Sequence, residues 1–210
     1  MIRDNFGLYV ILTNPVAGYM KSAEAAVKAG VSFLQLRMKD TPYKEVLEMA
    51  TLIRGITTGT NTKFIVNDDV RIAAEAYADG VHLGQNDMPI AEARDFWQEP
   101  GKIYGLSTHS EEQAQLALSG EPDYIGVGPV YKTPTKVIPD PVLGLDRMGA
   151  IIRAVPLPAI AIGGINETNL HAVLQAGAQN FSVVRPIMES HQPYVVIKEF
   201  QAMWEDFYVL

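Results

Sequence analysis

Short apolar segments alternate with helical patterns along the whole chain, and this alternation constrains the fold more than any other feature. The strand-like segments lie at residues 8–13, 33–38, 64–66, 81–83, 103–106, 124–130, 159–162 and 181–184. Between them, apolar residues recur at a spacing of three to four, as at Val46, Met49, Ala50 and Ile53, which predicts amphipathic helices. Strands that alternate with helices form a parallel sheet.

Glycine separates a helical segment from the next strand at Gly30, Gly80 and Gly177, where it predicts a left-handed helix C-cap and a tight loop. These repeated units, with no linker between them, predict an α/β fold in which residues 1–210 form a single (β/α)8 TIM barrel domain. The alternative is an open doubly wound sheet. That fold requires a phosphate-binding glycine motif after the first strand, and residues 13–18 do not contain one.

Composition narrows the classes of function. The net charge of −7 argues against a general nucleic-acid-binding protein, which would carry a basic face. The chain has no cysteine, which excludes disulfides and thiolate chemistry. The N-terminus shows no signal-peptide pattern, and no apolar run reaches membrane-spanning length. We therefore expect a cytoplasmic protein.

The carboxylates Asp68 and Asp87 each follow a predicted strand, at 63–66 and 80–84. Because the two strands belong to one β-α-β unit and run parallel, both turns emerge at the same end of the sheet. The two carboxylates together suit one Mg²⁺, which also binds a substrate phosphate. The alternative is that both residues cap helices, as we predict for Asp69.

The second strand predicts a polar row directed into the barrel mouth. Side chains alternate along a strand, so Gln35, Arg37 and Lys39 share one face, and Leu34 and Leu36 pack on helices. Arginine binds a phosphate with two hydrogen bonds, and lysine acts as a point charge. Internal pairing with acids such as Asp68 is the alternative.

The fifth strand ends at Ser107, which suits a hydrogen bond to a substrate ring but also a cap or turn. The sequence indicates no Ser/His/Asp triad and no histidine metal site. It assigns no role to any of the histidines, His82, His109, His171 and His191.

A long proline-containing loop at about 132–144 follows the sixth strand, where a barrel places its active site. Its residues Thr133, Thr135 and Lys136 suit a phosphate, although a surface turn has the same composition.

The seventh strand, 159–162, predicts a small inward row of Ala159, Ala161 and Gly163 that leaves room for a ligand, with Ile160 and Ile162 facing helices. Gly164 offers a bare backbone N–H beside the end of the eighth strand, where barrels commonly bind phosphate. The sequence thus predicts two anion sites, one at Arg37, Lys39 and Lys136 with a metal, and one at Gly164.

Several of these segments resemble the thiamine-phosphate synthase family, in order over about residues 8–188. They are residues 35–39, 67–68, 80–87, 105–107, 128–136 and 162–165. The resemblance implies a (β/α)8 barrel that couples hydroxymethylpyrimidine diphosphate to hydroxyethylthiazole phosphate, giving thiamine phosphate and pyrophosphate. In that reaction pyrophosphate departs first, and the thiazole nitrogen captures the pyrimidine-methyl cation. Metal and cationic side chains neutralise the leaving group, so no covalent nucleophile is needed.

The resemblance also assigns the site residues. The residues implied to hold the pyrimidine diphosphate are Gln35, Arg37, Lys39, Asn67, Ser107 and Lys136, and the catalytic ones among them are Arg37, Lys39, Ser107 and Lys136. Asp68 and Asp87 are implied to hold Mg²⁺. The residues implied to hold the thiazole phosphate are Thr133, Thr135, Gly164, Val184 and Arg185.

Arg185 departs from the family pattern, which usually has a small residue there. Its side chain either adds a charge to the thiazole phosphate site or fills its place. Two other functions stay open: a thiazole tautomerase-like enzyme, which needs no diphosphate–metal site, and a non-catalytic protein that binds a phosphorylated metabolite. The helical C-terminus, from Tyr194 to about Phe207, covers the barrel wall or meets another subunit, so the oligomeric state stays open.

Overall fold

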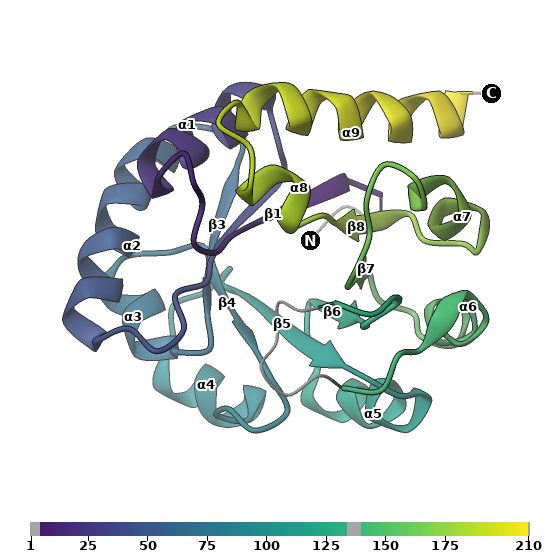
Figure 1. The fold of residues 1–210 in the computed structure, drawn as a ribbon. Coiled ribbons are helices and arrows are strands. Elements are labelled where there is room, and N and C mark those ends of the chain that lie inside the picture. Colours follow the sequence, from purple (N-terminus) through teal and green to yellow (C-terminus); the bar gives the residue numbers. More distant parts are fainter. Residues whose placement is uncertain (1–4, 134–139, 210) are drawn as a thin grey trace.

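Eight parallel strands close into a barrel in the computed structural model, which describes residues 5–133 and 140–209 (Figure 1). Each strand pairs with the next, and β8 returns to pair with β1. The strands are β1 Gly7–Leu12, β2 Phe33–Leu36, β3 Lys63–Asn67, β4 Gly80–Leu83, β5 Ile103–Thr108, β6 Tyr124–Val127, β7 Ala159–Ile162 and β8 Asn180–Ser182. The predicted barrel is confirmed.

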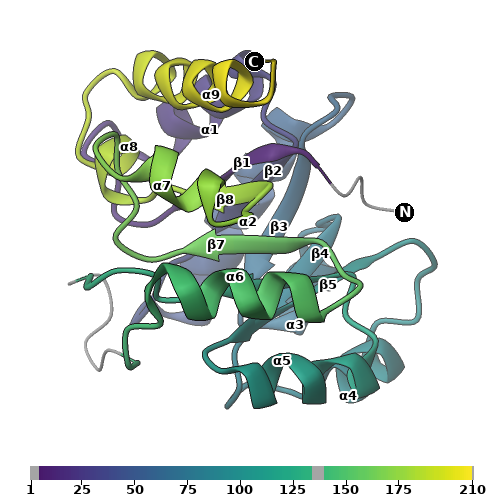
Figure 2. The ribbon, with the colours of Figure 1, turned by 90° about the vertical axis from the view of Figure 1, so that its right-hand side faces the viewer.

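Helices surround the barrel and cover the outer face of the sheet (Figures 1 and 2). They are α1 Tyr19–Ala29, α2 Tyr43–Thr57, α3 Val70–Glu75, α4 Ile90–Phe96, α5 Glu111–Ala117, the 3-10 turn η1 Leu118–Gly120, α6 Gly144–Ala154, α7 Leu170–Gln175, α8 Arg185–Met188 and α9 Pro193–Val209. Within the described part of the chain, none of them is long and apolar enough to cross a membrane.

Alternation along the strands divides the core in two. Leu34 and Leu36 belong to the large apolar layer between sheet and helices, as predicted. A smaller cluster fills the barrel interior, and its buried members are Tyr9, Ile11, Phe33, Ile65, Tyr124 and Ile160. Because adjacent residues of a strand point to opposite faces, Gln35 lies on the interior side with Phe33.

The predicted orientation of β7 is wrong. Ala159 and Ala161 belong to the helix-facing layer, whereas Ile160 and Ile162 belong to the barrel interior. In the register of β7 with β8, Ile162 lies opposite the small residue Ser182. Side-chain volume is therefore balanced across neighbouring strands, and the size of one residue does not decide which face it occupies.

Two of the three predicted glycine conformations are confirmed. Gly30 caps α1 in the left-handed conformation, and Gly177 has a φ of +107° after α7. Gly80 instead lies inside β4, and Tyr77 takes the left-handed position after α3. A Cβ on Gly80 would lie 2.2 Å from the carbonyl oxygen of Ile103. Glycine at position 80 therefore permits close strand pairing and does not cap a helix.

Helix α9 covers the barrel wall beside β1 and packs along α1 (Figures 1 and 2). Its residues Ile197 and Phe200 are buried. Gly7 at the start of β1 has a φ of +74°, and a Cβ there would lie 3.0 Å from the Trp204 ring. Of the two positions left open for this helix, the structure shows the one against the barrel.

Candidate active site

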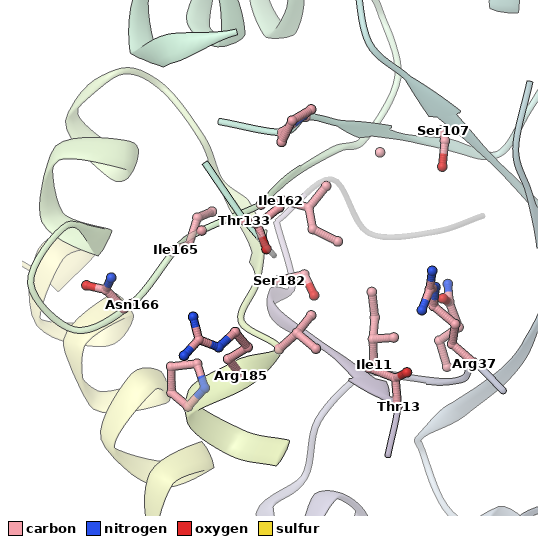
Figure 3. Close-up of a pocket in the computed structure, with 18 of the residues that line it drawn as sticks. Ile11, Thr13, Arg37, Ser107, Thr133, Ile162, Ile165, Asn166, Ser182 and Arg185 are labelled. Carbon is pink, nitrogen blue, oxygen red and sulfur yellow. The ribbon is translucent and has the colours of Figure 1, made fainter. Parts of the chain in front are cut away.

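A cavity of about 520 Å³ opens at the carboxyl ends of the strands. It is lined by most of the predicted site residues: Gln35, Arg37, Asn67, Ser107, Thr133, Gly164, Val184 and Arg185. Figure 3 shows Arg37 and Ser107 toward one side and Asn166 and Arg185 toward the other, with Ile162 and Ser182 between them. Thr135 and Lys136 lie outside the described residues. The cavity thus has two ends, and we name them after Ser107 and Arg185.

Gln35 and Arg37, two of the three residues of the predicted polar row, line the cavity, whereas Lys39 is not among its lining residues. Gln35 is buried, and its Nε2 donates to the hydroxyl of Tyr9 at 3.0 Å. The backbone of Arg37 is fixed by a 2.9 Å bond from its N–H to the carbonyl of Leu12. Its guanidinium lines the cavity, as predicted.

Lys39 forms an ion pair with Asp68, which was the alternative to anion binding. The side chain of Lys39 is about half exposed, at 48%. Exposed ion pairs contribute at most about 1 kcal/mol. Such a pair is weak enough for each partner to exchange it for a ligand.

Asp68 and Asp87 approach each other as predicted. The pKa of Asp87 is raised, first by partial burial and also by the negative charge of Asp68, while a backbone N–H opposes the shift. That N–H belongs to Gly84 and donates to Oδ2 of Asp87 at 2.6 Å. Two neighbouring carboxylates of this kind form a donor set for a hard cation such as Mg²⁺, which needs only one or two of them. Among the described residues, no group of three or more acidic or histidine side chains suits a metal.

Helix capping accounts for Asp69 and not for the carboxylate pair. The side chain of Asp69 accepts from the N–H groups of Arg71 and Ile72, at 2.9 and 3.4 Å, at the start of α3. The residue that precedes α4 is Pro89, and Asp87 bonds back to Gly84. The prediction for Asp69 is confirmed.

The loop after β7 forms the Arg185 end of the cavity. Gly164 has a φ of +67°, and a Cβ there would lie 2.7 Å from Cβ of Tyr131. Asn169 holds the loop by donating from Nδ2 to the carbonyl of Gly164 at 2.9 Å. Glycine is thus required both by the backbone conformation and by the close approach of the segment after β6.

Arg185 begins α8 and lines the cavity. Its Nε donates to Oε1 of Glu189 at 2.9 Å, and its side chain is about half exposed. The guanidinium is thereby held at the rim, so it does not fill the cavity.

His82 is a cavity residue that the sequence did not assign. Its Nε2 lies 2.9 Å from Oγ of Ser107, and its Nδ1 lies 3.0 Å from the hydroxyl of Tyr124. Tyr124 in turn contacts the hydroxyl of Tyr9 at 2.8 Å. Burial raises the pKa of both tyrosines, so both keep their protons near neutral pH. Alternation from Gly80 along β4 is the signal that places His82 inward.

Two further cavity residues were missed. His109 contacts the carbonyl of Gly128 at 2.6 Å through Nδ1, and its Nε2 lies 3.4 Å from Asp140. Ser182 is buried, and its hydroxyl has no hydrogen-bond partner among the described residues. Both contacts of His109 join it to the segment after β6, and no pattern in the sequence indicates them.

Comparisons with known proteins identify the family of the chain. A family model described as thiamine monophosphate synthase matches residues 8–187. A thiamine-phosphate synthase of Gloeobacter violaceus is 43% identical over 89% of this chain and 54% of its own length. A putative thiamine-phosphate synthase of Geobacter sulfurreducens is 36% identical over 92% of both chains. The chain spans about half the length of the first curated relatives that it matches.

Solved structures give the same result. Thiamine phosphate pyrophosphorylase from Pyrococcus furiosus superposes with a TM-score of 0.88 at 32% identity, over 97% of this chain and 98% of that one. A 3-hexulose-6-phosphate synthase, at 19% identity and a TM-score of 0.69, shares the fold. The family model, the curated relatives and the Pyrococcus structure together show that this chain belongs to the thiamine monophosphate synthase family.

Proposed function

We propose that the protein is a thiamine-phosphate synthase. It joins 4-amino-2-methyl-5-hydroxymethylpyrimidine diphosphate to 4-methyl-5-(2-hydroxyethyl)thiazole phosphate and releases thiamine phosphate and pyrophosphate. The observation that carries the proposal is a single cavity in which the Gln35–Arg37 row lies toward one end and the Gly164 loop toward the other. Such a cavity suits two phosphorylated substrates held side by side.

The Ser107 end suits the pyrimidine diphosphate. Gln35 and Ser107 offer hydrogen bonds to the ring, and Asn67, which pairs with His82 in the register of β3 and β4, lines the same cavity. Arg37 and Lys39 supply positive charge for the diphosphate, with Lys136 assigned from the sequence alone. Asp68 and Asp87 would hold Mg²⁺, which would supply positive charge for the leaving pyrophosphate.

The Arg185 end suits the thiazole phosphate. Thr133, Gly164, Val184 and Arg185 all line the cavity. In the reaction, the bond from the pyrimidine methylene carbon to the diphosphate oxygen breaks, and its electron pair leaves with pyrophosphate. The thiazole nitrogen then forms the new bond to that carbon. The protein's part is to position both substrates and stabilise the departing charge.

Pyrophosphate release tests the proposal. We expect release only when both substrates and Mg²⁺ are present, with thiamine phosphate formed in equal amount. Isomerisation of the thiazole substrate without pyrophosphate would favour a tautomerase. Saturable binding of either substrate without turnover would favour a non-catalytic binding protein.

Arg185 supplies a second test, confined to the thiazole site. If its guanidinium adds charge to that site, Arg185→Ser raises KM for the thiazole phosphate by about tenfold, the size expected for one charged hydrogen bond. Glu189→Ala, which removes the acceptor of the Arg185 Nε–H, lowers the same KM. An inactive wild type with an active Arg185→Ser variant would show instead that the arginine closes the site.

A further inference from the structure

A chain of hydrogen bonds crosses the barrel interior and joins two walls of the cavity. Its five side chains come from five strands and are Gln35 of β2, Tyr9 of β1, Tyr124 of β6, His82 of β4 and Ser107 of β5. We call it the interior chain. Gln35, His82 and Ser107 line the cavity, and Tyr9 and Tyr124 are buried beneath it.

The first two bonds have a defined direction. Nε2 of Gln35 donates to the hydroxyl oxygen of Tyr9. Tyr9 is buried, so its own hydrogen needs an acceptor, and among the described residues the Tyr124 oxygen at 2.8 Å is the one in reach. Tyr9 therefore donates to Tyr124.

The same reasoning determines which ring nitrogen of His82 carries the proton. The Tyr124 oxygen accepts from Tyr9, so the Tyr124 hydrogen is directed to Nδ1 of His82, 3.0 Å away. Neutral His82 then carries its proton on Nε2 and donates it to Oγ of Ser107 at 2.9 Å. The hydroxyl hydrogen of Ser107 stays available to a ligand in the cavity.

The two residues that end the interior chain thus present opposite hydrogen-bonding groups to the cavity. With Nε2 engaged by Tyr9, Gln35 offers its Oε1 as an acceptor, while Ser107 offers a donor. Reversal of every bond would invert both ends together, because the amide of Gln35 would have to turn over. The interior chain therefore couples the acceptor at Gln35 to the donor at Ser107, across the width of the barrel.

The packing around His82 and Tyr124 holds the two side chains in hydrogen-bonding contact. The rings of His82 and Tyr124 stack, with centroids 5.5 Å apart and planes at 24°. A Cβ on Gly105 would lie 2.1 Å from Cζ of Tyr124 and 2.6 Å from Nδ1 of His82. Any side chain at position 105 would separate the two rings.

We infer that Tyr9, Tyr124 and His82 are positioning residues that select the ring of the first substrate. A 4-aminopyrimidine presents an amino donor and ring-nitrogen acceptors, which match an acceptor at Gln35 and a donor at Ser107. The 4-oxo ring replaces the amino donor with a carbonyl acceptor, which is unmatched against the acceptor at Gln35. The inference rests on the proposed function, because it concerns the pyrimidine diphosphate of that reaction.

Tyr124→Phe tests the inference, with Tyr104→Phe as the matched control. Tyr104 is also a buried tyrosine, but its hydroxyl donates to the carbonyl of Trp97, in the helix-facing layer. The measurement is kcat/KM for the 4-amino diphosphate divided by that for the 4-oxo analogue. We expect Tyr124→Phe to lower this ratio on the order of tenfold or more, because sites built on hydrogen bonds reject mismatched analogues strongly. Tyr104→Phe should keep the ratio within about twofold.

General loss of structure would lower both rates and leave the ratio unchanged. Tyr9→Phe interrupts the same interior chain and is expected to lower the ratio as well, which keeps the test decisive if Tyr124→Phe does not fold. A wild-type ratio retained in either folded variant would overturn the inference.

Equilibrium binding separates this inference from the proposed function. If the wild type releases no pyrophosphate, the function is wrong, and the dissociation constants of the two diphosphates are compared by calorimetry instead. Preference for the 4-amino ring that is lost in Tyr124→Phe then supports the selection on its own. Equal binding of both rings by the wild type would refute it.

Discussion

At the scale of single residues, the site places like charges together and holds them against their mutual repulsion. The raised pKa of Asp87, caused by burial and by Asp68, means that the folded protein binds a proton there more readily than the unfolded chain does. Its ionised form therefore destabilises the fold above that pKa, and the penalty fades as pH falls through the folded pKa toward the unfolded value. In the proposed function, the carboxylate pair trades stability for cation binding.

Asp87→Asn tests this trade. The amide oxygen can still accept from Gly84, but the charge is gone. Without Mg²⁺, we expect a higher free energy of unfolding than the wild type near pH 7, with the gain shrinking as pH is lowered, measured by denaturant titration. The Mg²⁺ concentration for half-maximal activity should rise at least about tenfold, since one of two carboxylate ligands is lost.

Asp69→Asn is the matched control, because Asp69 neighbours the pair yet caps α3. Asparagine is a comparable cap, so stability should change by less than about 1 kcal/mol. Its Mg²⁺ response should match the wild type. Equal shifts in the Mg²⁺ response of both variants would remove Asp87 from the metal site.

At the scale of elements, β7 shows how neighbouring strands set the direction of a side chain. Its alanines face helices and its isoleucines face the interior, where Ile162 meets Ser182 of β8. The sequence predicts this strand correctly, but it predicts the wrong set of alternate side chains for the barrel interior. A strand buried on both faces carries apolar residues on both, so hydrophobicity does not show which residues face the interior and which face the helices.

Two substitutions on β7 distinguish its faces. Ala161→Leu should overpack the helix-facing layer and lower the free energy of unfolding by about 1–3 kcal/mol, with substrate KM values unchanged. Ile162→Ala should enlarge the cavity and raise KM for at least one substrate. Unfolding curves and steady-state kinetics of both variants check the assignment, and the reverse pattern of effects would contradict it.

At the scale of the whole molecule, the two ends of the chain lie in contact at the place where the barrel closes. The Trp204 ring of α9 lies against Gly7 of β1, and its Nε1 donates to the carbonyl of Gln179 at 2.8 Å. The last helix thereby covers the seam where β8 meets β1. Neither Gly7 nor Trp204 lines the cavity, so their contact bears on stability and not on chemistry.

Gly7→Ala tests the seam, with Gly59→Ala as its control. Both glycines have a φ near +75°, but a Cβ on Gly59 meets nothing within 4 Å. Left-handed strain costs each variant about 1–2 kcal/mol. Gly7→Ala should lose more stability than Gly59→Ala because Trp204 must move. Thermal unfolding of both variants measures this difference. Activity per folded molecule should be unchanged. Equal losses of stability in the two variants would show that Trp204 of α9 can move away from position 7 at no cost.

The sequence by itself determined the barrel and much of its chemistry. Strand and helix periods are local properties, and eight such units leave few ways to bury their apolar faces. Strand alternation on β2 was enough to direct Gln35 and Arg37 toward the cavity, and the order of strands was enough to bring Asp68 and Asp87 together. These predictions required only spacing along the chain.

Only the tertiary structure decided the partners. The interior chain joins residues separated in sequence by 26, 115, 42 and 25 positions. No local sequence pattern predicts the contact between His82 and Ser107, because it depends on the register of β4 with β5 and on the space left by Gly105. The phase of β7 and the position of α9 likewise depend on surfaces that form only when the barrel closes.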